Sequence, residues 1–434
     1  MATLKAVRGT RDLLPPETAL WNRIEATARA VFARYNFGEI RTPIFEDTSL
    51  FARSVGEETD IVSKEMYTWE DRARAQSEKS QSLTLRPENT AGVVRAYIEH
   101  RLGETGQLQK LYYIGPQFRR ERPQKGRYRQ FSQIGAEVIG PPSAGSESPL
   151  RDAEVLEMLA TLLDELGITG WTLELNSVGS AADRTRYNEA LRAALEPLAP
   201  AMCADCQRRA VTNPLRVLDC KVPEDQPIIA TLPAISDSLD EDSRAHFAAV
   251  TAALDAAGVP YKLNHRLVRG LDYYTRTTFE FTHGGLGAQN ALLGGGRYDG
   301  LSEAIGGPKA PGIGFAIGLD RLVLTLQTQE LNQSSAPRQV ADAYIAPLGE
   351  SINPAALALA RELRRTGLRV ELGEGGFRLK KSFEAADKTA RRIVILGEDE
   401  LQSGILTVKD FASGNQTKVP RADLVAFLTQ SASE

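Results

Sequence analysis

The chain has 434 residues, of which 42% are hydrophobic and 25% charged, and its formal net charge is −4. This length exceeds what one core usually holds, so we expect two or three domains. No apolar run is long enough to span a membrane and the N-terminus has no apolar leader, which together predict a cytoplasmic protein with no membrane partner. The small negative charge implies that any nucleic-acid contact uses a local basic surface.

The N-terminal half alternates predicted helices and strands. Apolar residues at helical spacing predict a helix at about 17–35, and others are expected at 90–100 and 152–166. Strands are expected at 83–86, 111–114, 128–139 and 171–178. The strands on either side of a polar loop with Pro123 and Gly126 predict an antiparallel hairpin with a long tip. From 180 to 257 the pattern becomes helical, which indicates an inserted helical subdomain.

After the insertion, strands are expected at 261–268 and 277–282. A Gly-rich turn is predicted in LLGGGRYDGL, and a strand leading into a helix in PGIGFAIGLDRLVLTL. Residues 331–339 are typical of a linker. Beyond them, strands and helices alternate over 340–434 and end in a helix at about 421–428. This alternation predicts a separate α/β domain with a mainly parallel sheet.

The hairpin tip is strongly basic, with six Arg or Lys residues between positions 119 and 129 against one acid, Glu121. Arginine suits a fixed phosphate clamp, because it stays charged and presents a planar fork of donors. The alternative is a solvated basic loop. Gln133 and Glu137 interrupt the apolar pattern of the second strand, however, and polar groups there need partners or a ligand. We therefore favour a binding site.

Other segments add side chains of matching chemistry. Arg119, Arg269 in LVRGLDYYT and Arg321 in GLDRL stand at the ends of predicted strands, and three permanent cations together favour a polyphosphate ligand. Carboxylates, amides and phenols suited to a small polar, cationic metabolite are supplied by Glu88, Gln133, Glu137, Tyr273 and Tyr274. Singly, each is better explained as a surface ion pair or polar contact; their co-occurrence carries the inference.

Several site types find little support. The chain has neither a G-x-x-x-x-G-K-[ST] phosphate loop nor an H-E-x-x-H zinc motif. Three cysteines argue against a disulfide framework. Cys203-x-x-Cys206 and Cys220 leave a zinc site without a fourth cysteine, so three reduced structural thiols are favoured over zinc and no metal site is assigned.

These motifs together resemble the bacterial histidyl-tRNA synthetases, a family of class II aminoacyl-tRNA synthetases, over essentially the whole chain. The matching stretches are VRGTRDLLP, TLRPENTAG, the hairpin at 113–140 (motif 2), NPLRVLDCK, LVRGLDYYTRTTFEF, LLGGGRYDGL, GFAIGLDRL (motif 3) and GGFRLKKSFEAADKTARRIVILGE. The resemblance implies an α+β catalytic domain at 1–330 with a mostly antiparallel sheet flanked by helices and a helical insertion at 180–257. It further implies an α/β anticodon-binding domain at 340–434, and a homodimer formed through the segment around Pro43.

The resemblance also implies an activity and its ligands. The reaction is the ligation of L-histidine to its tRNA with ATP as a substrate and Mg²⁺ as a cofactor. Arg119 and Arg269 are the implied catalytic residues, both near the α-phosphate, while Phe131 stacks on adenine, Arg321 meets the terminal phosphates and Glu121 also contacts ATP.

The implied histidine ligands are Glu88, Thr90 and Gln133 for the α-amino group, and Glu137, Tyr273 and Tyr274 for the imidazole. The implied contacts to the tRNA acceptor end are Arg122, Gln124, Lys125 and Arg127.

Two other functions fit parts of the pattern. One is the non-catalytic, synthetase-like regulatory subunit of ATP phosphoribosyltransferase. Its members typically lack the C-terminal domain and the RGLDYYT arginine, both of which this chain keeps. The other is a class II synthetase for a different amino acid, which would share Arg119 and Arg321 but need a different pocket. An active histidine–tRNA ligase is the leading hypothesis.

Overall fold

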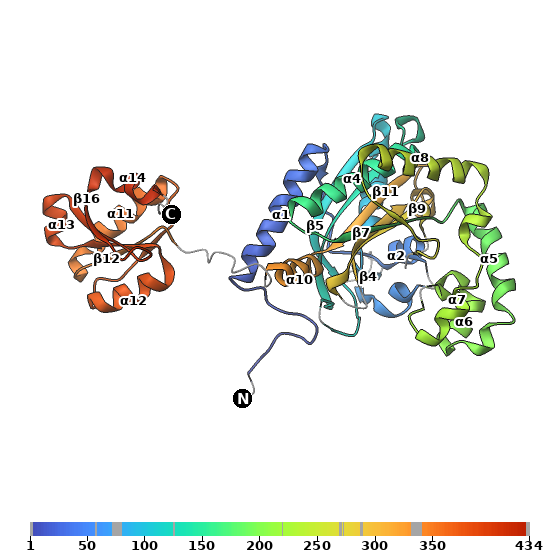
Figure 1. Ribbon diagram of the computed structural model, residues 1–434, viewed down its shortest axis with the longest axis horizontal. Helices are drawn as coiled ribbons and strands as arrows, with labels where there is room; N and C mark the ends of the chain where they lie inside the picture. Colours follow the sequence, from blue (N-terminus) through green and yellow to red (C-terminus); the bar gives the residue numbers. More distant parts are fainter. Residues whose placement is uncertain are drawn as a thin grey trace. The chain divides into compact units, whose positions relative to one another are not determined.

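The computed structural model describes residues 3–430 apart from 57–58, 72–79, 125, 219, 269–270, 272, 287–289 and 331–340 (Figure 1). The chain forms two compact units, Met1–Ser335 and Ala336–Glu434. The linker expected at 331–339 lies outside the described residues. Within the described residues, no helix combines the length and the apolar character needed to cross a membrane.

The first unit is built on an eight-stranded sheet with the strand order β1-β5-β6-β11-β10-β9-β7-β8. Its strands are β1 (Gly38–Glu39), β5 (Gln109–Phe118), β6 (Gln130–Ile139), β7 (Trp171–Ser177), β8 (Lys262–Leu263), β9 (Thr275–His283), β10 (Ala291–Arg297) and β11 (Gly312–Gly318). The two edge strands are parallel to their neighbours: β1 pairs with β5 and β8 pairs with β7. Every other neighbouring pair in this order is antiparallel. The mostly antiparallel sheet predicted from the sequence is confirmed.

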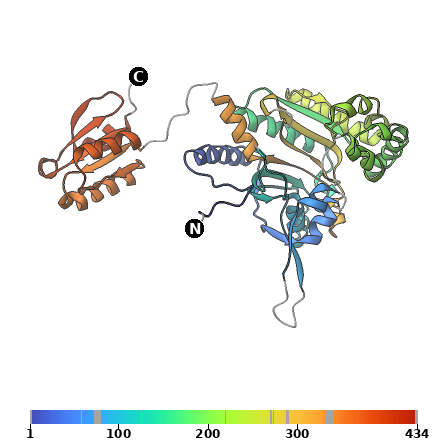
Figure 2. The ribbon, with the colours of Figure 1, turned by 90° about the horizontal axis from the view of Figure 1, so that it is seen from below.

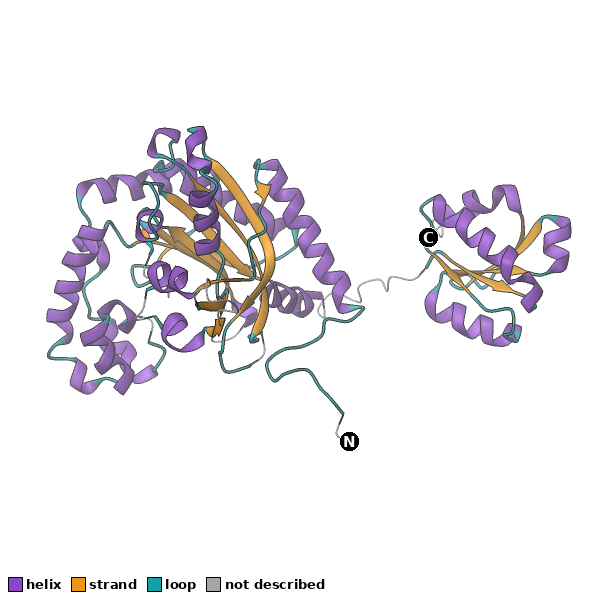
Figure 3. Ribbon diagram, turned by 180° about the vertical axis from the view of Figure 1, so that it is seen from behind, coloured by secondary structure: helices purple, strands orange, loops and turns teal. Residues whose placement is uncertain are grey.

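Four helices share the main core with one face of this sheet, and Figure 3 shows helices flanking the strands. They are α1 (Glu17–Arg34), α4 (Pro149–Glu165), α8 (Glu241–Ala257) and α10 (Leu319–Glu330). In α1, buried Ile24, Ala28 and Val31 follow the helical repeat and so form one apolar stripe. The matching sheet face supplies residues such as Ile134 and Phe315, whose side chains are almost fully buried.

The insertion contains α5 (Ala181–Leu195), α6 (Ala204–Thr212) and α7 (Gln226–Ile229), as expected for a helical subdomain. These helices share a separate core with Tyr187, Val217 and Ile235. The helical subdomain is shorter than the expected 180–257, because Val250 and Leu254 of α8 are buried in the main core instead. In helix α8 the apolar stripe faces α4 rather than the insertion.

The first unit also contains a separate three-stranded sheet. Its strand order is β2 (Phe45–Asp47), β4 (Gln81–Leu85) and β3 (Tyr67–Asp71). Figure 2 shows β3 and β4 extending from the body of the unit. The short helices here are α2 (Thr48–Val55), α3 (Thr90–Glu99) and α9 (Leu301–Ala304). Helix α3 begins at Thr90, just after Glu88. Both of these predicted site residues therefore lie at the start of this helix.

Two local predictions after the insertion differ from the structure. The first six residues of LLGGGRYDGL, where a turn was expected, instead belong to strand β10 in the middle of the sheet, and the chain turns only at Asp299 and Gly300. The glycines of β10 permit a close strand approach: a Cβ atom on Gly295 would lie 2.1 Å from the carbonyl oxygen of Gly314. The expected strand at 261–268 is only the two-residue β8, because the chain turns at Asn264, whose carbonyl accepts the backbone N–H of Leu267.

The second unit has a five-stranded sheet in the order β13-β12-β14-β15-β16. Its strands are β12 (Ala343–Pro347), β13 (Val370–Leu372), β14 (Arg392–Leu396), β15 (Ile405–Asp410) and β16 (Gln416–Pro420), and its helices are α11 (Asn353–Arg365), α12 (Leu379–Thr389), α13 (Glu398–Ser403) and α14 (Leu424–Thr429). The prediction of a mainly parallel sheet was wrong: β15 and β16 form an antiparallel hairpin that adds to the parallel strands β13, β12 and β14.

Candidate active site

The strand register gathers polar side chains on the sheet face opposite the main core. Directly paired residues of neighbouring strands point to the same face. Glu137 on β6 pairs with Gly314 on β11, which pairs with Gly296 on β10. Gln133 pairs with Gly318 in the same way. On this face, polar side chains therefore lie beside a central strip of glycines. Because glycines have no side chains, this face has open space, whereas apolar side chains fill the opposite face.

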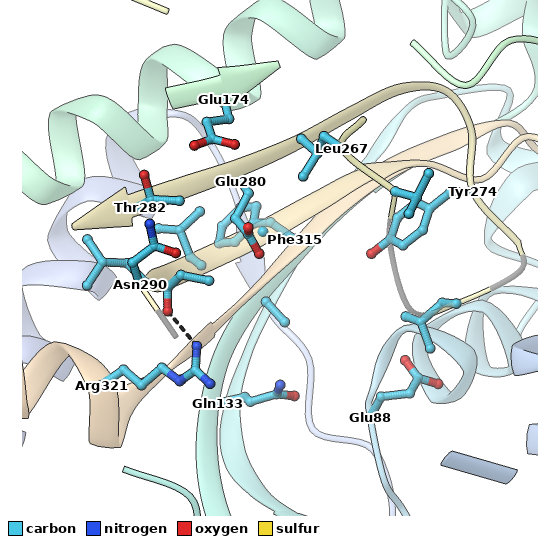
Figure 4. Close-up of a pocket in the computed structure, with 18 of the residues that line it drawn as sticks. Glu88, Gln133, Glu174, Leu267, Tyr274, Glu280, Thr282, Asn290, Phe315 and Arg321 are labelled. Carbon is cyan, nitrogen blue, oxygen red and sulfur yellow. Dashed lines mark hydrogen bonds between the residues drawn. The ribbon is translucent and has the colours of Figure 1, made fainter. Parts of the chain in front are cut away.

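A pocket of about 990 Å³ lies over this strip. Its walls come from the hairpin, the start of α3, the strands β7, β9, β10 and β11, and the helical subdomain. Figure 4 shows Glu88, Gln133, Tyr274 and Glu280 directed toward one common space. Most residues predicted for the site line it: Glu88, Thr90, Arg119, Glu121, Arg127, Phe131, Gln133, Tyr273, Tyr274 and Arg321.

Arg119 directly follows strand β5 and is held in place by two hydrogen bonds. Its backbone N–H donates to Arg129, which closes the strand pair, and its side-chain Nε donates to the carbonyl oxygen of Pro87 at 2.9 Å. The guanidinium carbon lies 5.4 Å from the ring centre of Phe131. Because its Nε is held by a backbone carbonyl, Arg119 lines the pocket as a pre-positioned cation.

Two further predicted arginines line the pocket. Arg321 follows β11 in the first turn of α10, and its Nη1 donates to the carbonyl oxygen of Ala291 at 2.6 Å (Figure 4). Arg127 forms an ion pair of 3.0 Å with Glu121, whose other carboxylate oxygen lies 3.8 Å from Arg119. Glu121 thus holds the hairpin arginines near one another.

Glu88 and two tyrosines form another part of the pocket lining. The Glu88 carboxylate accepts the backbone N–H groups of Thr90 at 2.7 Å and Ala91 at 3.1 Å, so it caps α3. Burial raises the pKa of the Glu88 carboxyl, although these two donors and the charge of Arg119 act to lower it. The rings of Tyr273 and Tyr274 lie 4.8 Å apart, and burial raises the pKa of Tyr273 well above its usual range.

Glu137 is a predicted histidine ligand that does not line the open pocket. It is fully buried against Gly314, where a Cβ atom would lie 1.6 Å from the carboxylate. Thr90 donates to it at 2.8 Å and Tyr113 at 3.5 Å, and both of these residues do line the pocket. Burial raises the pKa of Glu137 to about 8. This shift favours the protonated form of the carboxyl.

One side-chain atom of Gln133 indicates that this part of the pocket binds a ligand. Its side-chain carbonyl oxygen is buried and, within the described part of the chain, has no hydrogen-bond partner. A buried acceptor left unpaired costs about 1–3 kcal/mol, so such atoms are rare unless a ligand meets them. The position suits a donor such as an ammonium group beside Glu88.

The remaining predicted residues lie elsewhere. Arg269 and Lys125 are outside the described residues. Arg122 and Gln124 are exposed on the hairpin tip and do not line the pocket. Gln124 exchanges backbone hydrogen bonds with Arg127, which makes the tip a tight turn.

Sequence reasoning missed several pocket residues. Glu174 on β7 and Glu280 on β9 pair directly across the strands, and both line the pocket. The helical subdomain contributes Arg209 and Arg216 to the wall. The stretch NPLRVLDCK, which contains Arg216, was the available signal, although nothing in it indicated contact with the sheet.

A buried ion network supports the end of β10. Arg297 is fully buried, and its Nη1 donates to Asp152 of α4 at 2.5 Å while its Nη2 donates to Asp299 at 2.9 Å. Burial raises the pKa of Asp152 to about 6 in spite of this cation. The network ties helix α4 to the glycine strand, so it is structural rather than part of the pocket.

Comparison with known proteins identifies the family. The family model "Histidyl-tRNA synthetase" matches residues 9–322, and the model "Anticodon binding domain" matches residues 342–431. The chain belongs to the histidyl-tRNA synthetase family. It is 72% identical over 426 residues to the histidine–tRNA ligase of Koribacter versatilis (strain Ellin345), covering 98% of this chain and 96% of that relative.

Other relatives agree with this membership. The histidine–tRNA ligase of Solibacter usitatus (strain Ellin6076) is 56% identical over 427 residues, covering 98% of this chain and 99% of that one. The solved apo structure of S. aureus histidyl-tRNA synthetase superposes with a TM-score of 0.79 at 38% identity, covering 99% and 100% of the two chains. The family predicted from the sequence is confirmed, and the regulatory-subunit alternative is not favoured.

Proposed function

We propose that this chain acts as a histidine–tRNA ligase, joining L-histidine and ATP into histidyl-adenylate and diphosphate and then passing histidine to the 3′ end of its tRNA. The observation that carries the proposal is that one pocket holds both fixed cations suited to phosphates and polar groups suited to an amino acid. Arg119 and Arg321 line the same pocket as Glu88 and the tyrosine pair. Glycines of β10 and β11 also line this pocket.

For ATP, we assign the α-phosphate to Arg119, adenine stacking to Phe131 and the terminal phosphates to Arg321, with Glu121 holding the hairpin arginines. The contact of Arg119 with Pro87 supports the first assignment, because a pre-positioned cation loses little freedom when charge develops on phosphorus. Arg269 is the second catalytic residue that we propose, on the basis of the sequence alone.

For histidine, we assign the α-amino group to Glu88, Thr90 and Gln133, supported by the unpaired buried oxygen of Gln133. Tyr273, Tyr274 and Glu137 are assigned to the imidazole ring. Glu137 lies against Gly314 of the pocket floor, so a ring N–H that reaches it would replace its buried proton and lower its pKa. Apolar amino acids would leave these groups unpaired and be rejected.

The first reaction step needs no general base. The histidine carboxylate is ionised at neutral pH and attacks the α-phosphorus in line, while diphosphate leaves. Catalysis therefore consists of positioning and of stabilising charge on the phosphorus oxygens, which fixed arginines supply.

We propose that Glu174 and Glu280 hold the Mg²⁺ ion that accompanies ATP. Two carboxylates directly opposite on antiparallel strands repel each other, which a cation between them would relieve. Mg²⁺ prefers one or two carboxylates together with substrate phosphates. When bound, the ion neutralises phosphate charge.

The remaining parts of the proposal concern tRNA and assembly. The hairpin tip with Arg122, Gln124, Lys125 and Arg127 meets the acceptor end, and the second unit reads the anticodon in the cytoplasm. We also propose a homodimer through the segment around Pro43. Next to Pro43, Ile44 and Phe45 leave large apolar side chains 45% and 52% exposed, as a subunit interface would require.

The testing experiment is ATP–pyrophosphate exchange measured with each standard amino acid separately, without tRNA. Exchange with histidine alone supports both the chemistry and the pocket assignment. Exchange with a different amino acid would overturn the histidine assignments. No exchange with any of them would overturn the ligase proposal and favour a regulatory, non-catalytic protein.

A further inference from the structure

The helical subdomain contains a cluster of metal-ligating side chains at some distance along the chain from the reaction residues. Cys203, Cys206, Cys220 and Asp225 each offer one ligand atom, and these four atoms all lie within 4.8 Å of one another. The sulfur atoms of Cys203 and Cys220 are 3.9 Å apart, and the Cys220 sulfur lies 3.2 Å from Asp225 Oδ2. Zinc–sulfur bonds of about 2.3 Å in a tetrahedral site place sulfur atoms about 3.8 Å apart.

The cluster is built by two short segments that pack together. Cys203 is the N-cap of α6 and Cys206 lies in its first turn, so the C-x-x-C pair projects from one helix end. Cys220 follows a 3-10 turn, and Asp225 ends the next one, Pro223–Asp225. Folding thus supplies a fourth ligand that a count of cysteines could not reveal, and that ligand is a carboxylate.

The surroundings favour negatively charged ligands. The backbone N–H of Val222 donates to the Cys220 sulfur at 3.4 Å, and the N–H of Cys203 donates to Asp225 Oδ1 at 3.0 Å. Amide donors of this kind orient and stabilise metal-bound thiolates and carboxylates. Cys206, Cys220 and Asp225 are buried, and among the described residues no Lys, Arg or His forms an ion pair with Asp225. A buried carboxylate normally requires such a partner or a metal.

We propose that Cys203, Cys206, Cys220 and Asp225 bind one zinc ion with a structural role. The three thiols each release a proton, and Zn²⁺ joins three thiolates and one carboxylate. All four positions are then filled by the protein, which is the pattern of a structural rather than a catalytic zinc site.

The metal would fix one wall of the candidate active site. It joins the start of α6, which carries Arg209, to the segment that carries Cys220 and Lys221, and these three residues line the pocket. The core around Val217 and Ile235 is small and separate from the main core, and a bound ion would add to its stability. The inference does not depend on the ligase reaction.

The test is the metal content of the full chain, purified under reducing conditions and dialysed against metal-free buffer. We expect about one zinc per chain by plasma mass spectrometry, and less than about a tenth of that in Cys206→Ser. Asp225→Asn should weaken zinc binding by about tenfold or more in a chelator competition. Asp205→Asn is the matched control, because Asp205 lies on α6 between the two cysteines but is exposed and pairs with Arg208.

Cobalt substitution gives a second readout that does not depend on stability. The Co²⁺ form should show the visible bands of a tetrahedral site and the thiolate-to-metal absorption in the near ultraviolet, and both should be lost in Cys206→Ser. Three freely reactive thiols without zinc, or a Cys203–Cys220 disulfide in the purified chain, would overturn the proposal. Unchanged zinc affinity in Asp225→Asn would overturn the assignment of the fourth ligand.

Discussion

The buried carboxyl of Glu137 makes a measurable prediction about stability. Glu137 is fully buried on β6 and its pKa is raised from an ordinary value of 4.5 to about 8, chiefly by burial. Glu137→Gln keeps the shape and a hydrogen-bonding head but removes the titrating group. We expect the substitution to change how the stability of the first unit depends on pH.

The sign follows from proton linkage. Between pH 4.5 and 8 the unfolded chain has released the Glu137 proton while the folded chain retains it. The folded state therefore binds more protons, and the free energy of unfolding falls as pH rises. A pKa difference of this size between the folded and the unfolded chain changes the free energy of unfolding by about 5 kcal/mol, at about 1.36 kcal/mol per pH unit. The stability of Glu137→Gln relative to the natural chain should thus rise by about 4–5 kcal/mol between pH 4.5 and 8.5.

The assay is urea unfolding at these two pH values, followed by tryptophan fluorescence. All three tryptophans, at positions 21, 69 and 171, belong to the first unit, so unfolding of the second unit does not enter the signal. Glu303→Gln is the matched control, because it removes a carboxylate from the exposed surface of α9. A variant whose relative stability is the same at both pH values would refute the reasoning, since it would mean that Glu137 is already ionised in the folded protein.

Three further predictions follow from the contacts described above. Arg297→Met should lower the free energy of unfolding of the first unit by about 3–5 kcal/mol in the same fluorescence assay, because it leaves a buried carboxylate unpaired; an unchanged midpoint would contradict this. Gly314→Ala should abolish histidine-dependent pyrophosphate exchange, because its Cβ would lie 1.6 Å from the Glu137 carboxylate, whereas Gly38→Ala meets no atom within 4 Å and should keep the exchange rate. Arg119→Ala should slow exchange by about 10²–10³-fold with little effect on the KM for histidine; equal losses in kcat and affinity would indicate a role in binding instead.

The sequence is most informative where local pattern and tertiary environment agree. The hairpin at 113–140 was predictable because alternating apolar residues on both sides of a basic, glycine-containing loop specify two paired strands. Arg119 and Gln133, which line the pocket, were predicted from the sequence of this hairpin, whereas Phe131 was assigned through the family resemblance.

Prediction failed where distant segments decide the outcome. The glycines of β10 have the local character of a turn, and only the crowding between β9 and β11 makes them a strand. Glu174 and Glu280 become neighbours through strand register, and Asp225 joins the cysteines through two packed turns. None of these relations has a signature in residue spacing.

The glycine strip at the floor of the pocket has a consequence for the entropy of binding. Gly294, Gly314 and Gly318 present peptide backbone, which has no rotamers to lose when a substrate settles on it. Immobilising a long side chain costs about 0.5–1.5 kcal/mol on binding. The glycine floor adds nothing to that cost, and Arg119 is already restrained by Pro87. Shape selection by the floor comes from the fixed path of the chain rather than from side chains that adapt to each ligand.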